Sequence, residues 1–152
     1  MVSLPLKRVL SESSDPDNPP PEAMEEIFET TARIAVVGLS RDPTKPARRV
    51  PSYLAAKGFE IFPVNPNAER ILGKAAVPSL DELEEAVDMV VVFRPSSDAA
   101  LVVEQAAARQ ERPVIWLQEG IRADEAVARA RQAGLTAVQD LCTYKVHRAL
   151  IT

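Results

Sequence analysis

The chain has 152 residues, with 18 Lys and Arg, 22 Asp and Glu, one Cys and one His. This length and a net charge of −4 are typical of one small globular domain. A single cysteine excludes an internal disulfide, and one cysteine with one histidine leaves a zinc or iron centre without its ligands, so we expect no metal. Because the sequence lacks a run of about 20 apolar residues and a signal-peptide pattern, we expect a cytoplasmic protein that does not bind membranes.

The charge is unevenly distributed along the chain. Residues 1–31 hold seven acidic and two basic side chains, which leaves the remainder close to neutral. The remainder has no basic tract interleaved with aromatic residues, so we expect no nucleic-acid partner. A small anionic ligand is compatible with this composition.

The first 21 residues differ from the rest of the sequence. Residues 11–21 have no apolar periodicity and contain four prolines, which predicts an irregular or disordered segment. We therefore expect residues 1–21 to form an irregular N-terminal extension and residues 22–152 to form the domain. A short helix from Pro21 to Thr31 is predicted to open it.

Four short runs of β-branched and aromatic residues predict strands that are covered on both faces, and a weaker fifth run follows. The predicted strands are residues 34–37, 59–64, 89–93, 114–117 and 136–138.

Helical patterns separate these strands. Residues 51–57 begin with Pro51 and precede Gly58, and Ser79 starts a capping-box pattern that ends at Glu82. Further helices are predicted over residues 97–110, 123–133 and 143–150. This alternation predicts an α/β fold, namely a single Rossmann-like, doubly wound domain with a mainly parallel five-stranded sheet and helices on both faces.

The loop after the first predicted strand is the strongest candidate for a binding site, because ligands of such folds lie outside the carboxyl ends of the strands. It carries Arg41, Lys45, Arg48 and Arg49 against a single acid, Asp42. A helix N-terminus follows, where backbone N–H groups and the helix dipole favour anions. We interpret the loop as phosphate-binding, with a solvated basic loop as the alternative.

The ends of the next strands also carry polar residues. Asn65 and Asn67 suit a ribose, base or phosphate, or an ordinary turn. Arg94 suits a phosphate or a purine ring, or a surface ion pair.

Two nucleotide-binding motifs are absent. Ser40 and Pro43 stand where the dinucleotide fingerprint that begins at Gly38 requires glycines. The pair Gly73-Lys74 is followed by Ala75, so the chain also has no P-loop at this point.

No catalytic set emerges from the sequence. His147 is expected to be structural or solvent-facing, since no nucleophile is identified beside it. Cys142 is either a buried small hydrophobe or a redox-sensitive thiol. Trp116 is expected in the core, and Glu119 has no evident partner for a role as general base.

Several fragments between Ile34 and Leu150 occur together in a familiar order. They are Ile34–Ser40 with Asp42-Pro43, Pro63–Pro66, Ile71–Gly73, Pro78–Leu80, Val87-Asp88, Phe93-Arg94, Trp116–Gln118 with Gly120-Ile121, and Asp140 with Cys142. In this register the sequence resembles the stand-alone bacterial and archaeal CoA-binding domain proteins.

The resemblance implies a Rossmann-like domain similar to the nucleotide-binding domain of the succinyl-CoA synthetase alpha subunit, which binds coenzyme A along the strand ends. It implies no established reaction. The residues that it assigns to CoA fall into four groups. They are Gly38, Ser40, Arg41, Lys45, Arg48 and Arg49 for the phosphates, Asn65 and Asn67 near the second strand, Arg94, Pro95 and Ser96 near the adenine, and Gln118, Gly120 and Ile121 closing the site.

We therefore expect a small protein that binds CoA or an acyl-CoA and has no evident catalytic activity. The alternatives are an NADP-dependent or acyl-CoA-processing enzyme, and a subunit that docks on a larger acyl-CoA synthetase.

Overall fold

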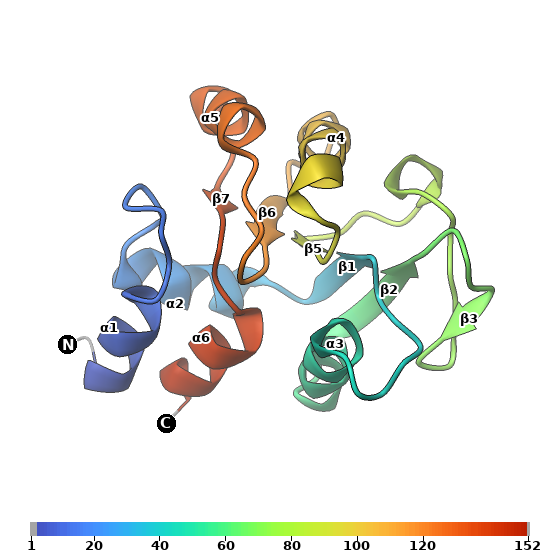
Figure 1. Ribbon diagram of the computed structural model, residues 1–152, viewed down its shortest axis with the longest axis horizontal. Helices are drawn as coiled ribbons and strands as arrows, with labels where there is room; N and C mark the ends of the chain where they lie inside the picture. The colour runs from blue at the N-terminus through green and yellow to red at the C-terminus, as the bar shows by residue number, and fades with distance from the viewer. Residues whose placement is uncertain (1–2, 152) are drawn as a thin grey trace.

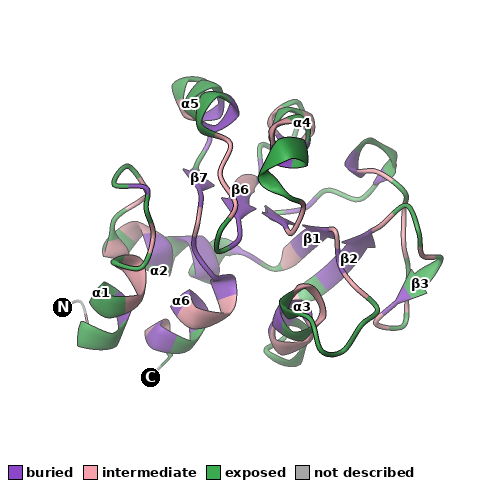
Figure 2. Cartoon of the chain, in the orientation of Figure 1, coloured by how far each residue is buried: buried purple, intermediate pink, exposed green. Residues whose placement is uncertain are grey.

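A parallel sheet forms the centre of the computed structural model, which describes residues 3–151 (Figure 1). Its strands are β1 (Arg33–Val37), β2 (Glu60–Val64), β5 (Met89–Val92), β6 (Val114–Leu117) and β7 (Ala137–Val138), in the spatial order β2-β1-β5-β6-β7. Every neighbouring pair in this sheet is parallel. The predicted fold class is confirmed, because apolar runs such as Met89–Val92 are buried on both faces of the sheet (Figure 2).

Helices cover both faces of the sheet. Helices α4 (Ser96–Ala107) and α5 (Asp124–Gln132) pack on one face, where their alanines and valines meet residues of β5 and β6. The other face carries the remaining helices. They are α1 (Leu4–Leu10), α2 (Pro21–Thr30), α3 (Pro46–Ala56) and α6 (Thr143–Leu150). The predicted helices over residues 21–31 and 143–150 therefore have nearly the expected bounds.

Helix α3 begins five residues earlier than the sequence pattern predicts. Pro46 opens the helix and Pro51 lies inside it. A proline cannot donate to the carbonyl four residues before it, so the carbonyl of Ala47 is available to another donor. The N–H of Ser40 takes this carbonyl at 3.0 Å, which ties the loop after β1 to the start of α3.

The capping-box prediction at Ser79 was wrong. Leu80–Glu82 form only a single 3₁₀ turn, η1, and the Ser79 side chain makes no capping hydrogen bond. The guanidinium of Arg109 instead donates to the carbonyls of Leu80, Leu83 and Glu85 at 2.8–3.1 Å. The side chain of Arg109, from the loop after α4, thus holds these carbonyls in a loop.

A small hairpin that the sequence analysis did not predict follows β2. It pairs β3 (Arg70–Ile71) with β4 (Lys74–Ala75) through a turn in which Leu72 and Gly73 both have positive φ. Strands this short carry too little periodicity to be recognised from sequence.

The N-terminal extension is more ordered than expected. Residues 4–10 form α1, whose first turn is capped by Ser3 and whose Leu6 is buried in the core beneath the sheet. The helix forms because Leu6, Val9 and Leu10 find apolar partners in that core. The proline-rich stretch after α1 lacks helix and strand.

Polar contacts fasten the proline-rich stretch to the sheet edge at β7. Asp15 is only 6% exposed and forms an ion pair with Arg131 at 3.1 Å and a hydrogen bond with Gln139 at 3.0 Å. Ser14 donates to Asp140 through its N–H at 2.8 Å. These contacts with residues far away in the sequence explain why the segment's own pattern did not reveal its position.

The order in which strands are added to the sheet reverses between β1 and β5. From β1 the chain builds β2 on one side and then crosses to β5 on the other. The carboxyl ends of strands at such a switch point form the crevice where ligands of open α/β sheets bind. Within residues 3–151, no helix has the length and apolar character needed to cross a membrane.

Candidate functional site

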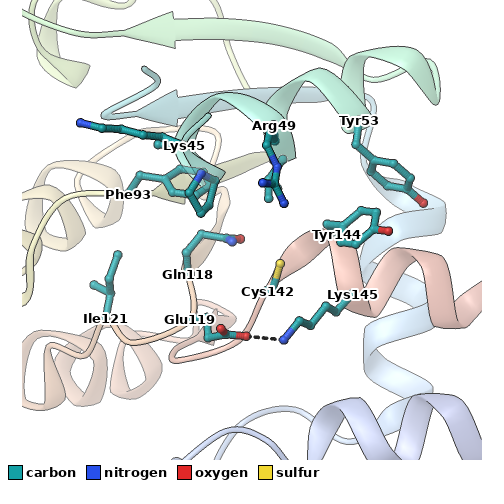
Figure 3. Close-up of a pocket in the computed structure, with 13 residues that line it drawn as sticks. Lys45, Arg49, Tyr53, Phe93, Gln118, Glu119, Ile121, Cys142, Tyr144 and Lys145 are labelled. Atoms are coloured by element: carbon teal, nitrogen blue, oxygen red, sulfur yellow. Dashed lines mark hydrogen bonds and ion pairs between the residues drawn. The ribbon is translucent and has the colours of Figure 1, made fainter. Parts of the chain in front are cut away.

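Two cavities lie side by side at the carboxyl edge of the sheet. The smaller, here called the loop cavity, has a volume of about 420 Å³. It is lined by Gly38, Ser40, Arg41, Asp42, Lys45, Ala47, Asn65, Asn67, Phe93 and Arg94. The larger, here called the helix cavity, has a volume of about 700 Å³ (Figure 3). Its lining is Lys45, Pro46, Ala47, Arg49, Val50, Tyr53, Phe93, Gln118, Glu119, Ile121, Cys142, Tyr144 and Lys145. The cavities share three residues, so one extended ligand can reach both.

Gly38 lets the end of β1 pass close to the end of β5. Its φ is +89°, and a Cβ placed on it would lie 3.3 Å from the backbone carbon and oxygen of Phe93. A larger residue would therefore be strained in conformation and crowded against backbone. The positive φ and the close approach to Phe93 explain why a glycine begins the basic loop.

Short turns shape the basic loop itself. The N–H of Asp42 donates to the Ser40 hydroxyl at 3.0 Å, and Thr44 donates to the Asp42 carboxylate from its N–H at 2.9 Å and its hydroxyl at 2.7 Å. These bonds from Thr44 lower the pKa of Asp42. The only acid of the loop is thus held in a turn.

Three of the five basic side chains that line the cavities form no ion pair with an acid in residues 3–151. Among residues 3–151, no acidic group forms an ion pair with Arg41, Lys45 or Arg49. The N–H of Ala47, in the first turn of α3, also has no hydrogen-bond partner in the described part of the chain. Unpaired cations beside a helix N-terminus form an environment that favours an anion.

Asn65 and Arg94 are already engaged within the protein. The Asn65 side chain donates to the carbonyl of Leu39 at 2.9 Å and accepts the N–H of Asn67 at 2.7 Å. Arg94 forms an exposed ion pair with Asp98 at 2.9 Å. Both residues line the loop cavity, where Asn65 holds the walls together and Arg94 contributes a cation that is partly neutralised.

Gln118 is the most deeply buried polar residue in the helix cavity. Its side chain accepts the N–H of Thr143 at 2.9 Å and the Thr143 hydroxyl at 2.8 Å through Oε1. Its Nε2 atom has no hydrogen-bond partner within the described chain. Figure 3 shows the amide pointing from the end of β6 toward the side of the cavity that holds Cys142.

An ion-pair network lies at the rim of the helix cavity. Lys145 contacts Glu119 at 2.8 Å and Glu12 at 3.0 Å. The hydrogen bonds that Lys145 donates to these two carboxylates raise the pKa of Lys145 well above its usual value. The pairing keeps Lys145 charged and leaves Glu119 engaged, so Glu119 has the partner that the sequence did not reveal.

His147 and Trp116 support the walls from behind. The Nδ1 atom of His147 lies 2.8 Å from the hydroxyl of Tyr53, and the ring packs against Phe28 and Phe59. Burial, together with the charge of Lys57, lowers the pKa of His147. Trp116 is fully buried and donates from Nε1 to the Leu141 carbonyl at 2.8 Å, just before Cys142.

The structure brings together ten of the fourteen residues that the sequence analysis assigned to ligand binding. Those that line neither cavity are Arg48, Pro95, Ser96 and Gly120. The Ser96 hydroxyl accepts the N–H of Arg122 at 3.2 Å, and the N–H of Gly120 donates to Asp140 at 2.6 Å. Arg48 reaches Ser52 and the carbonyl of Arg41. All three therefore make contacts that stabilise neighbouring loops.

Sequence reasoning missed the walls that come from the helices. Tyr53, Tyr144 and Lys145 line the helix cavity, and the sequence analysis assigned none of them a ligand-binding role. The usable signal was the end of the fifth strand, because α6 starts there and its first turn shares the carboxyl edge.

The chain belongs to the CoA binding domain family. The family model matches residues 32–148, which include all of the sheet and both cavities. The resemblance that the sequence fragments indicated is thereby confirmed.

Two relatives and one solved structure illustrate the range of similar proteins. The uncharacterized protein YneT of Bacillus subtilis is 38% identical over 130 residues, covering 86% of this chain and 96% of YneT. An ADP-forming acetate–CoA ligase II of Archaeoglobus fulgidus is 32% identical over 89 residues, covering 57% of this chain but only 13% of the ligase. A hypothetical protein from Pyrococcus horikoshii superposes with a TM-score of 0.84 at 31% identity, covering 93% of this chain and 99% of the other.

Proposed function

We propose that this protein binds coenzyme A, or an acyl-CoA, across the loop and helix cavities and catalyses no reaction of its own. The observation that carries the proposal is the set of Arg41, Lys45 and Arg49, cations around two adjoining cavities that have no ion pair with an acid in residues 3–151. Membership of the CoA binding domain family supplies the identity of the proposed anion. The proposed compartment is the cytoplasm, which suits a chain with one free cysteine.

The two ends of CoA differ in charge, and each end matches one of the two adjoining cavities. CoA has a polyanionic end, with a diphosphate and a 3′-phosphate, and a long neutral arm that ends in a thiol. The anionic end is assigned to the loop cavity, to Lys45, which both cavities share, and to Arg49 at the adjoining side of the helix cavity, where it would accept charge-assisted hydrogen bonds. The arm is assigned to the helix cavity, whose lining includes Val50, Tyr53 and Ile121.

We propose that the protein catalyses no reaction because the titratable groups near the cavities are engaged with other residues or lie outside the linings. Glu119 is paired with Lys145, and His147 lies outside both linings in contact with Tyr53. A general acid and base need a positioned proton donor and acceptor that both face the substrate. These two residues do not supply such a pair.

A calorimetric titration of ligand-free protein with CoA, 3′-dephospho-CoA and NADP tests the proposal. We expect CoA to bind, and to bind more tightly than its dephospho form because one charge-assisted contact is lost. Stronger binding of NADP than of CoA would instead support the alternative of an NADP-dependent enzyme. No heat with CoA would overturn the proposal.

The triple variant Arg41→Ala, Lys45→Ala, Arg49→Ala tests the location of the site. Each hydrogen bond to a charged group contributes about 1.5–3 kcal/mol, so we expect CoA affinity to fall by roughly a hundredfold or more. Arg129→Ala is the matched control, since Arg129 is an exposed cation on α5 that pairs with Glu104. Equal affinities of the triple variant and the control would refute the assignment.

A second candidate, a subunit that docks on a larger acyl-CoA synthetase, is favoured by one comparison. The chain matches only 13% of the Archaeoglobus fulgidus ligase, so a module of similar sequence occurs there as part of a larger protein. Co-purification from cells with tagged protein, with and without CoA, would test it. Recovery of a synthetase subunit in stoichiometric amount is the expected result for this candidate.

A further inference from the structure

The helix cavity contains a nucleophilic side chain that the proposed function does not use. Cys142 is the only cysteine of the sequence, it is free, and it is 8% exposed. The rest of its surface packs in the core beneath the sheet, and the residue lines the helix cavity. In Figure 3 its sulfur points into the cavity and faces the wall that carries Arg49. A reagent therefore reaches the thiol through the cavity.

Gln118 provides independent evidence that a ligand group belongs beside this thiol. It is only 3% exposed, and its Oε1 atom is held by both the N–H and the hydroxyl of Thr143, the residue after Cys142. The Nε2 donor has no partner in residues 3–151 but is open to the cavity. A ligand that fills the cavity and excludes water must offer this donor an acceptor, because an unpaired buried donor costs about 1–3 kcal/mol.

We propose that Cys142 is a covalent docking site that forms a reversible mixed disulfide with the thiol end of a CoA-type ligand. This inference rests on the proposed function, which brings the arm of CoA into the helix cavity. Gln118 is a positioning residue in the proposal. Its Nε2 atom donates to a carbonyl of the arm and holds the terminal sulfur near Cys142.

The reaction is a thiol–disulfide exchange with the disulfide of the same ligand class. The Cys142 sulfur attacks one sulfur of CoA disulfide, so that a new S–S bond forms while the S–S bond of the reagent breaks. The other half leaves as free CoA and takes up the proton that the Cys142 thiol loses. The chain has no second cysteine, so no internal disulfide can displace the adduct, and release requires an external thiol.

Intact-protein mass spectrometry under non-reducing conditions tests the proposal. Ligand-free protein is treated with CoA disulfide or with glutathione disulfide. We expect one CoA adduct per chain, formed roughly tenfold or more faster than the glutathione adduct because cavity binding raises the effective concentration of the reagent. Dithiothreitol should remove the adduct, and Cys142→Ser should form none. Equal rates with the two disulfides, or no CoA adduct, would overturn the proposal.

The role of Gln118 is tested by Gln118→Glu. This change keeps an oxygen for Thr143 and removes the Nε2 donor. We expect slower reaction with CoA disulfide and an unchanged rate with glutathione disulfide, in protein whose circular dichroism matches wild type. An unchanged rate with CoA disulfide would refute the positioning role.

A measurement on the unsubstituted protein does not depend on the folding of any variant. Reduced CoA should slow the alkylation of Cys142 by iodoacetamide by roughly tenfold or more at saturation, because the bound arm covers the thiol. Calorimetry with CoA and Cys142→Ser then separates the two levels of the argument. If that variant binds CoA but wild type shows neither protection nor a selective adduct, the covalent site is refuted and the proposed function stands. If CoA does not bind at all, the proposed function fails and the covalent site fails with it.

Discussion

The two cavities are built in different ways. The loop cavity draws on short segments in which bonding partners are close in sequence, as between Ser40 and Asp42 or Asn65 and Asn67. The walls of the helix cavity are joined by contacts between distant residues, such as Gln118 with Thr143 and Glu119 with Lys145. The charge of the candidate site is therefore encoded locally, while the helix cavity exists only when α3, β6 and α6 are packed together.

The largest effect on stability is expected from Gln118→Leu, which removes the contact between the end of β6 and the start of α6 in the helix cavity. The change leaves the buried N–H and hydroxyl of Thr143 without their acceptor. We expect a loss of about 3 kcal/mol in the free energy of unfolding, measured by urea denaturation. A loss below about 0.5 kcal/mol would mean that the distant contact does not hold the wall.

Gly38→Ala should produce a smaller loss at the floor of the loop cavity. The added Cβ would meet the backbone of Phe93 at 3.3 Å in a residue whose φ is +89°, so we expect a loss of about 2 kcal/mol. Gly58→Ala is the matched control, because its φ is +100° but nothing lies within 4 Å of the new Cβ. The control should lose about 1 kcal/mol by urea denaturation. Equal losses would show that the close approach of β1 and β5 is unimportant.

Asn65→Ala tests how the local bonds hold the loop cavity. It removes the bonds to the Leu39 carbonyl and the Asn67 N–H at a half-buried position, and we expect thermal unfolding to report a loss of about 1 kcal/mol. Asn67→Ala keeps the backbone N–H that Asn65 binds and should change stability by less than about 0.5 kcal/mol. A larger loss for Asn67→Ala than for Asn65→Ala would contradict the assignment of these bonds.

The smallest effect is a change in pH dependence behind the helix cavity. Burial and the nearby Lys57 charge lower the pKa of His147 from its ordinary value of 6.5. Below pH 6.5 the unfolded chain takes up this proton before the folded chain does, so stability should fall as the pH decreases through that region. His147→Gln should flatten this part of a plot of unfolding free energy against pH. An unchanged slope would assign the dependence to other groups.

The layers of the fold and the location of the candidate site follow from the amino-acid pattern. Runs such as Met89–Val92 are apolar without alternation, and only a strand covered on both faces explains them. The basic loop could be recognised because Arg41, Lys45 and Arg49 lie close together along the chain, in the segment that follows a strand end. The predicted bounds of helices were wrong where distant residues supplied the hydrogen-bond partners. At Ser79, Arg109 holds the carbonyls of the predicted helix. At Pro51, the missing N–H leaves a carbonyl for Ser40.

The packing of distant elements determines which of the expected residues face a cavity and which walls surround them. It directed Ser96 and Gly120 toward contacts between loops, and it brought Tyr53, Gln118 and Cys142 to one cavity although they are widely separated in sequence. It also gave Gln118 an acceptor that Thr143 occupies and a donor that has no partner within residues 3–151. Such pairings depend on the packing of α6 against the end of β6, and local periodicity carries no information about contacts between distant elements.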